Sequence, residues 1–183
     1  MDKNNVSTAK PRVGGGIYSA PLGSTLPTDA VSQIGSAFAA LGYISEDGIR
    51  NTNTPDSDSH RAWGGDIVDV TNKGKDDKFV FKLIEGKNVD VLKTIYGAAN
   101  VSGTLDGGIS VKATTTDAEH RAYIIDMVLK GGTLKRIVIP DAVITDVAEI
   151  TYKTDDLVGY EITLTAMADS AGVTHTEYIK GGS

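Results

Sequence analysis

Hydrophobic and polar residues alternate with a period of two along most of the chain after residue 109. In the stretch 160–167, Tyr160, Ile162 and Leu164 alternate with polar residues, and Tyr123 and Ile125 belong to a similar run. This period is typical of half-buried strands. Strands are therefore expected over 109–113, 123–129, 134–140, 143–152 and 160–167, with a terminal strand or arm over 174–180. A hairpin turn is expected at Lys130-Gly-Gly-Thr.

Two segments show helical spacing instead. In 29–41, apolar residues recur at helical intervals after a candidate N-cap at Thr28 or Asp29, and Gly42 stands where a helix commonly ends. In 88–96, Val89, Leu92 and Ile95 repeat at the same interval before Gly97. We expect a short N-terminal helix over 29–41 and a second helix over 88–96.

The first half of the chain holds a long polar stretch, residues 46–65, which ends in Trp63-Gly-Gly. A short edge strand is expected at 17–23, stopped at Pro21. Strands are also expected at 66–71 and 79–85, joined by a turn-rich hairpin connection at 72–77. A polar loop as long as 46–65 is uncommon in a compact domain unless it is functional or becomes ordered against a partner.

Together these elements predict a mainly β fold, either an antiparallel β-sandwich or a flattened barrel, with one flanking α-helix and the short N-terminal helix. The 183 residues fit a single domain with a core at 17–167. The polar segments 1–16 and 168–183 are expected to be extended arms. They contain few apolar side chains to offset the entropy of ordering, so we expect them to be mobile in the free subunit.

Composition and net charge exclude several classes of function. The net charge is −6 with no basic cluster, which argues against tight nucleic-acid binding through phosphate neutralisation. The chain has no cysteine, which excludes disulfides, thiolate catalysis and Cys-based metal sites. No apolar stretch approaches the ~20 residues of a membrane span. The N-terminus lacks a secretory signal, so synthesis and folding in a cytoplasm are expected.

No residue pattern indicates catalysis, a cofactor or a metal. The three histidines, His60, His120 and His175, lie far apart on polar sequence, and no nucleophile motif is present. The pair Asp56 and Asp58 lacks the other ligands of a calcium loop, so turn formation explains it better. Trp63 has two interpretations: a core side chain that anchors the return into the sheet, or an exposed interface anchor.

Several blocks of sequence resemble the major tail (tail tube) proteins of long-tailed, siphovirus-type phages. They include Ile17-Tyr-Ser-Ala-Pro-Leu-Gly, Ala62-Trp-Gly-Gly-Asp, Leu83-Ile-Glu-Gly-Lys-Asn-Val-Asp, Gly132-Thr-Leu-Lys-Arg-Ile-Val-Ile-Pro and Gly159-Tyr-Glu-Ile-Thr-Leu-Thr-Ala. The blocks follow one another in order from about residue 13 to 180.

This resemblance implies a non-enzymatic subunit of the virion tail, assembled in the host cytoplasm, which forms hexameric rings that stack into a tube. The implied partners are other copies of the chain, a tape measure protein inside the tube, and tail terminator and distal tail proteins at its ends. DNA would pass through the lumen without specific binding, and no insertion into a membrane is implied.

Within this framework, the 46–65 loop is expected to make ring-stacking or subunit contacts because it is long, polar and ends at a tryptophan. The candidate contact residues are Asn51, Asn53, Pro55, Asp56, Asp58, His60 and Trp63. Candidates for the lumen wall are Asp126, Glu161 and Thr163, which alternation places opposite the apolar face of their strands. The competing interpretation is that these three side chains are solvated on the outer wall of the tube.

Two other functions remain open. The chain could be a monomeric β-sandwich module that binds a carbohydrate or a cell surface through the 46–65 loop, where Trp63 and Tyr43 are the nearest aromatic residues. It could also be the inner-tube protein of a contractile injection system, which would share the fold and differ mainly in having a sheath partner.

Overall fold

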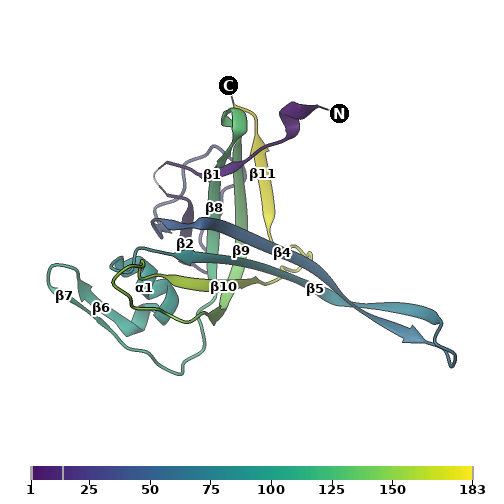
Figure 1. Ribbon diagram of the computed structural model, residues 1–183. Helices are drawn as coiled ribbons and strands as arrows, with labels where there is room; N and C mark the ends of the chain where they lie inside the picture. Colours follow the sequence, from purple (N-terminus) through teal and green to yellow (C-terminus); the bar gives the residue numbers. More distant parts are fainter. Residues whose placement is uncertain (1, 14, 183) are drawn as a thin grey trace.

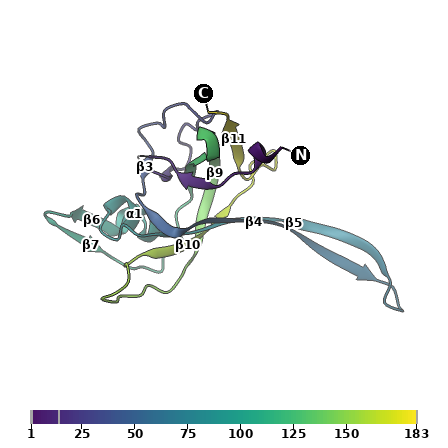
Figure 2. The same cartoon turned by 45° about the horizontal axis from the view of Figure 1, so that its top comes forward.

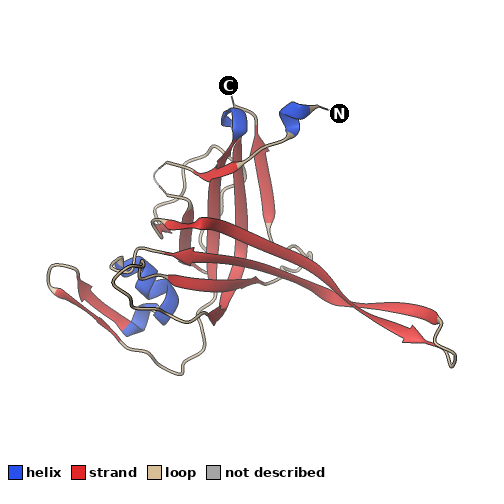
Figure 3. Ribbon diagram, viewed as in Figure 1, coloured by secondary structure: helices blue, strands red, loops and turns tan. Residues whose placement is uncertain are grey.

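The computed structural model describes residues 2–13 and 15–182, and their fold is mainly antiparallel β-structure (Figures 1 and 3). Nine strands form one sheet in the order β3-β2-β8-β9-β10-β5-β4, with β1 added to β8 and β11 added to β9. The strands are β1 (Ala9–Pro11), β2 (Ile17–Pro21), β3 (Ala39–Ala40), β4 (Ile44–Arg61), β5 (Ile67–Leu83), β8 (Arg121–Leu129), β9 (Leu134–Val147), β10 (Tyr160–Ala166) and β11 (Thr176–Lys180). A separate hairpin pairs β6 (Val101–Thr104) with β7 (Gly108–Val111). The mainly β fold is confirmed, and the large sheet stays open rather than closing into a barrel.

Strand β9 bends the sheet into two layers. Its first part, Leu134–Val138, pairs with both β8 and β11, whereas its last part, Ala142–Val147, pairs with β10. Pro140 lies between the two parts, and the β8–β9 register shifts between Arg121 and Tyr123. A strand that changes layers through a bend or bulge is the usual corner of such packed sheets. In Figure 1, β8 and β11 accordingly run across the direction of β5 and β10. The two strands expected at 134–140 and 143–152 are thus one strand.

The main core fills the space between the two layers. In β10, Tyr160, Ile162 and Leu164 point into this core while Glu161 and Thr163 lie on the other face, as the alternation predicted. The fully buried members of the core are Ile17, Leu41, Phe79, Leu83, Val91, Tyr123, Ile139, Ala142, Ile162 and Leu164. Each buried Leu or Ile side chain contributes about 1.5–3 kcal/mol through its removal from water.

The helix expected at 88–96 is confirmed as α1 (Val89–Tyr96), the single α-helix in the described part of the chain. Asn88 caps it by accepting a hydrogen bond from the Asp90 backbone NH at 2.9 Å. Gly97 follows with a φ of 88°, which ends the helix. Val91 and Leu92 are buried in the main core, so α1 is held by its apolar face.

The helix expected at 29–41 is wrong: most of this segment is irregular and only Ala39–Ala40 is a strand. Asp29 Oδ1 accepts hydrogen bonds from the backbone NH groups of Val31 and Ser32, both at 2.6 Å. The carbonyls of Asp29 and Ser32 accept from Arg136 Nη1 instead of continuing a helix. Apolar residues of this segment are nevertheless buried, because Phe38 packs with Ala122 and Ile124 in a second small core. This segment therefore covers the outer face of β2 and β8.

The loop expected at 46–65 is also wrong, because it is part of a long two-stranded ribbon. β4 pairs with β5 from Ile49↔Phe81 to Arg61↔Ile67, and the chain reverses at 62–66 rather than at 72–77. The pairing changes from Asp56↔Gly74 to Ser57↔Asn72, so β5 has an extra residue at this point. This bulge accommodates the turn-forming residues around Gly74 within the strand. Both terminal arms contain a strand in the single subunit, since β1 pairs with β8 and β11 pairs with β9.

Candidate assembly surfaces

The ribbon of β4 and β5 projects well beyond the two-layered body (Figures 1 and 2). Strand β10 pairs with β5 only from Lys78 to Leu83, so the part from Ile67 to Asp77 has β4 as its one strand partner. At about 3.3 Å per residue, that part extends for about 35 Å. At the tip, the Ala62 NH donates to the Asp66 carbonyl at 2.8 Å and Arg61 Nη1 donates to the Gly65 carbonyl at 2.7 Å.

The candidate contact residues all lie on this ribbon. Asn53, Pro55, Asp56, Asp58 and His60 are exposed along β4, beyond the last pairing of β5 with β10. The ribbon thus brings them together on one projection, although whether they contact another subunit stays a prediction.

Trp63 lies in the turn at the tip of the ribbon, and its relative exposure is 107%. Its interpretation as a core side chain is therefore wrong. The other aromatic residue considered for a binding site, Tyr43, precedes β4 at the opposite end of the ribbon. The full length of β4 separates these two rings, so they do not form an aromatic cluster.

The outer half of the ribbon has two chemically different faces, because directly opposed residues of antiparallel strands share a face. The pairs Ser57↔Asn72 and Ser59↔Val70 carry no charge, and we call their side of the ribbon the uncharged face. The next pair on this side, Arg61↔Ile67, adds one cation at the tip. The pairs Asp58↔Thr71 and His60↔Asp69 form the charged face. Two contacts support this division: His60 Nε2 lies 3.0 Å from Thr71 Oγ1, and Lys73 forms an ion pair with Asp58.

The base of the ribbon is fixed by a fully buried carboxylate, Asp77. Its Oδ1 accepts a hydrogen bond from Asn51 Nδ2 at 2.8 Å, and its Oδ2 accepts from Thr174 Oγ1 at 2.6 Å and lies 2.5 Å from His175 Nδ1. Burial alone would raise the pKa of Asp77, but the hydrogen bonds from Thr174, Asn51 and His175 outweigh it and lower that pKa. Asn51 therefore has a structural role at the base of the ribbon.

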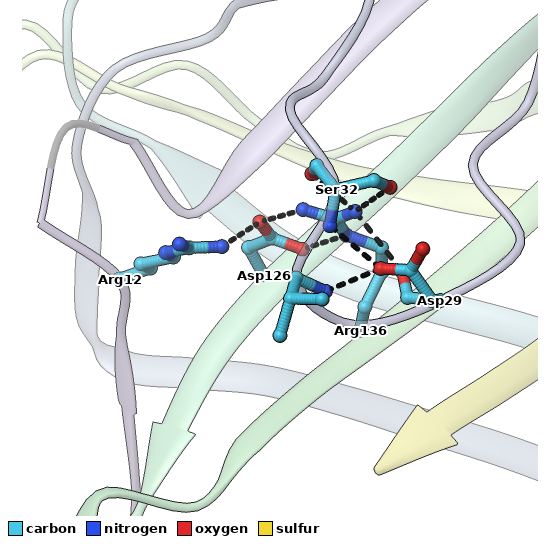
Figure 4. A network of polar contacts seen from close by, with 6 residues as sticks. Arg12, Asp29, Ser32, Asp126 and Arg136 are labelled. Atoms are coloured by element: carbon cyan, nitrogen blue, oxygen red, sulfur yellow. Dashed lines mark hydrogen bonds and ion pairs between the residues drawn. The ribbon is translucent and has the colours of Figure 1, made fainter. Parts of the chain in front are cut away.

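A second buried network, drawn in Figure 4, surrounds Asp126 on the outer face of β8 and β9. Arg136 Nε and Nη2 donate to the two carboxylate oxygens of Asp126 at 2.6 and 2.7 Å, and Arg12 Nη1 lies 3.4 Å from Oδ2. Arg136 Nη1 also holds the carbonyls of Asp29 and Ser32. The hydrogen bond from Arg136 to Asp126 is the main reason why the pKa of Arg136 is raised.

The expectation that Asp126 points outward to an open surface is wrong. Alternation correctly places it opposite Tyr123 and Ile125, but the 29–34 segment and Arg136 cover that face and leave Asp126 only 3% exposed. Its carboxylate is also neutralised by the arginines, so Asp126 serves to fasten the covering segment to the sheet.

Glu161 and Thr163 lie on the outer face of β10, which is half-exposed. Glu161 Oε1 accepts a hydrogen bond from Arg50 Nη2 at 3.0 Å. The neighbouring pairs Glu161↔Lys82 and Thr165↔Lys78 add two lysines to this outer face. The face is therefore polar and of mixed charge, with carboxylates opposing its basic groups, rather than acidic.

The described residues contain no group of three or more His, Asp or Glu side chains placed to hold a metal ion. None of the helices in this part of the chain is long and apolar enough to span a membrane. The polar clusters that the structure does contain, around Asp77 and Asp126, join segments of the fold to one another.

The chain matches the family model described as phage tail tube protein over residues 1–181. A search of curated proteins finds no significant match. Because the family match spans almost the whole chain, the protein belongs to the phage tail tube protein family, whose members are non-enzymatic structural subunits that self-assemble into the tube of the virion tail.

Proposed function

We propose that the protein is the tail tube subunit of a siphovirus-type phage and forms hexameric rings that stack into a tube. DNA and the tape measure protein would occupy the lumen, and tail terminator and distal tail proteins would close the ends. The subunits would assemble in the host cytoplasm. The inner tube of a contractile system shares this architecture, and the presence of a sheath on the virion separates the two.

The projecting ribbon carries the proposal that this chain stacks through residues 46–65. A two-stranded ribbon is marginally stable in water when nothing packs against it. Here the outer half exposes both faces, including Val68, Val70 and a fully exposed Trp63. A neighbouring ring would cover these apolar side chains, and the polar remainder would keep the free subunit soluble.

This contact is tested by shortening the ribbon without disturbing its base. The register pairs Pro55 with Lys75, so replacing residues 56–74 by an Asn-Gly turn removes the outer half of both strands together. The shortened protein should stay folded, because its core and the Asp77 network are intact, yet form no tubes under negative-stain microscopy. Normal tubes from this variant would refute the role of the ribbon, and a wild-type protein without rings or tubes would refute the proposed function.

For the lumen wall we propose the open outer face of β10, β5 and β4, which includes Glu161 and Thr163. The segment at 26–38 covers the corresponding outer face of β8, so the β10 face is the one left accessible. Paired charges suit a conduit, because unpaired cations would retain DNA phosphates by counterion release.

The Arg50–Glu161 ion pair provides the test. Glu161→Gln leaves Arg50 unpaired, so phage with this change should eject DNA more slowly at low salt and at the normal rate at high salt. Adding Arg50→Gln should restore the rate. An unchanged rate at low salt for Glu161→Gln would place this face outside the lumen.

A further inference from the structure

The outer half of the ribbon presents four large apolar side chains that its own subunit leaves uncovered. Trp63, Ile67, Val68 and Val70 are 107%, 54%, 64% and 57% exposed. The charged face carries an ion pair and a hydrogen bond across the strands, so its polar groups are partly satisfied already. The uncharged face and the tip are therefore the parts of the ribbon that gain most from being removed from water.

A groove of about 730 Å³ lies elsewhere in the subunit, between the turn at residues 84–88, the β6–β7 turn and residues 157–158. Its walls include Leu105 and Leu157, which are 61% and 63% exposed. The Glu85 carboxylate in this groove already has hydrogen-bond partners within the subunit. It accepts from the Tyr43 NH at 2.9 Å and from Asn88 Nδ2 at 3.0 Å. Lys87 makes no ion pair within the part of the chain that the structure describes.

The groove and the ribbon tip lie at opposite ends of the molecule. Figures 1 and 2 both show the β6–β7 hairpin on one side of the body and the tip of β4 and β5 on the other. When identical subunits repeat in a head-to-tail manner, one end of each copy meets the other end of the next. This arrangement brings the tip of one copy to the groove of its neighbour.

The chemistry of the two surfaces also matches. Both are apolar at the centre. The tip carries Asp66, whose side chain has no partner among the described residues, and Arg61, which donates to the Gly65 carbonyl within the turn. The groove carries Lys87, which also lacks an ion pair in the described part of the chain. An unpaired acid and an unpaired base at the rim would favour one orientation over the other.

We propose that Trp63 and the uncharged face of the ribbon dock in the groove lined by Leu105 and Leu157 of a second copy of this chain. The inference rests on the proposed function, because it requires stacked subunits, and it adds the receptor surface and the face of the ribbon that meets it. Trp63→Ala should raise the protein concentration needed for tube formation by about 30-fold or more, as expected for a buried interface tryptophan.

Cross-linking tests the proposal, and the absence of native cysteine makes the design clean. Tubes of the Val70→Cys/Leu157→Cys variant, treated with a short bismaleimide, should give a ladder of linked subunits on a denaturing gel. The matched control is Asp69→Cys/Leu157→Cys, which moves the thiol by one residue to the charged face and should give little ladder. Tubes that yield no ladder from the first variant, or equal ladders from both, overturn the proposal while leaving the proposed function intact.

If the double-cysteine variant does not assemble, a second measurement with Leu157→Cys alone tests the same contact. Leu157→Cys subunits mixed with excess wild-type protein should react with a maleimide at least about tenfold more slowly in tubes than as free subunits, since a docked residue is removed from solvent. Equal labelling rates in tubes and free subunits overturn the docking site. A wild-type preparation that forms no tubes refutes the proposed function itself.

Discussion

Replacement of Arg136 by Met should destabilise the subunit by about 3–5 kcal/mol, because it leaves the buried Asp126 carboxylate without its bidentate partner. Both side chains are almost completely buried, and the remaining cation, Arg12, lies at 3.4 Å and is partly exposed. The change also removes the donor to the carbonyls of Asp29 and Ser32. Such a loss is a large fraction of the about 5–15 kcal/mol that stabilises a typical domain.

Urea unfolding of the free subunit measures this loss, and two further variants make the result specific. Arg50→Met breaks the exposed Arg50–Glu161 pair and should cost about 1 kcal/mol or less. Arg136→Met with Asp126→Leu removes both buried charges and should recover much of the stability. Limited proteolysis should then still cleave the 29–34 segment faster than in the wild type, because its anchor is gone. A loss below about 1 kcal/mol for Arg136→Met would refute the view that this ion pair fastens the covering segment.

Three further outcomes follow from the geometry. Leu164→Ala should cost about 2–5 kcal/mol in urea unfolding by opening a cavity in the main core, whereas Leu157→Ala at the surface should cost less than about 0.5 kcal/mol; equal losses would contradict the assignment of the core. The pKa of Asp77 lies below its ordinary 3.8, so its stabilisation is complete above that pH and is lost as the pH falls through the lower pKa of the folded protein. As the pH is lowered from about 5 to about 3, the stability of Asp77→Asn should therefore fall less than that of the wild type; equal falls would contradict this interpretation. Trp63→Ala should leave the urea midpoint of the free subunit unchanged, because the side chain is fully exposed; a lowered midpoint would mean that the tip packs on its own subunit.

The sequence predicts those elements well whose two faces differ in environment. Strand β10 alternates because one face is in the core and the other is half-exposed, and α1 has an apolar stripe for the same reason. Gly42 was rightly singled out, since its φ is 72° and a side chain there would collide with Glu85. It serves a turn into β4 rather than a helix end, which spacing alone does not distinguish.

The failures have long-range causes. Residues 29–41 have helical spacing, but their backbone carbonyls bind Arg136, a residue more than 100 positions away in the chain. Asp126 was placed on the correct face of β8, yet nothing in local alternation shows that another segment will cover that face. The strands expected at 66–71 and 79–85 both fall largely within β5, but the β4 half of the ribbon is not predicted. Both faces of its outer part are exposed, so no apolar alternation marks it as a strand.

The buried polar networks and the exposed outer ribbon are expected to serve folding and assembly separately. Asp77 and Asp126 are buried and fully partnered, so their contacts are completed within one subunit. The outer ribbon contributes nothing to the core, and its apolar side chains remain in water. Substitutions in the first group are therefore expected to change the stability of the subunit, and substitutions in the second to change tube formation. If this division holds, a series of ribbon substitutions will change tube formation over a wide range at constant subunit stability, because no interaction of the core is altered by them.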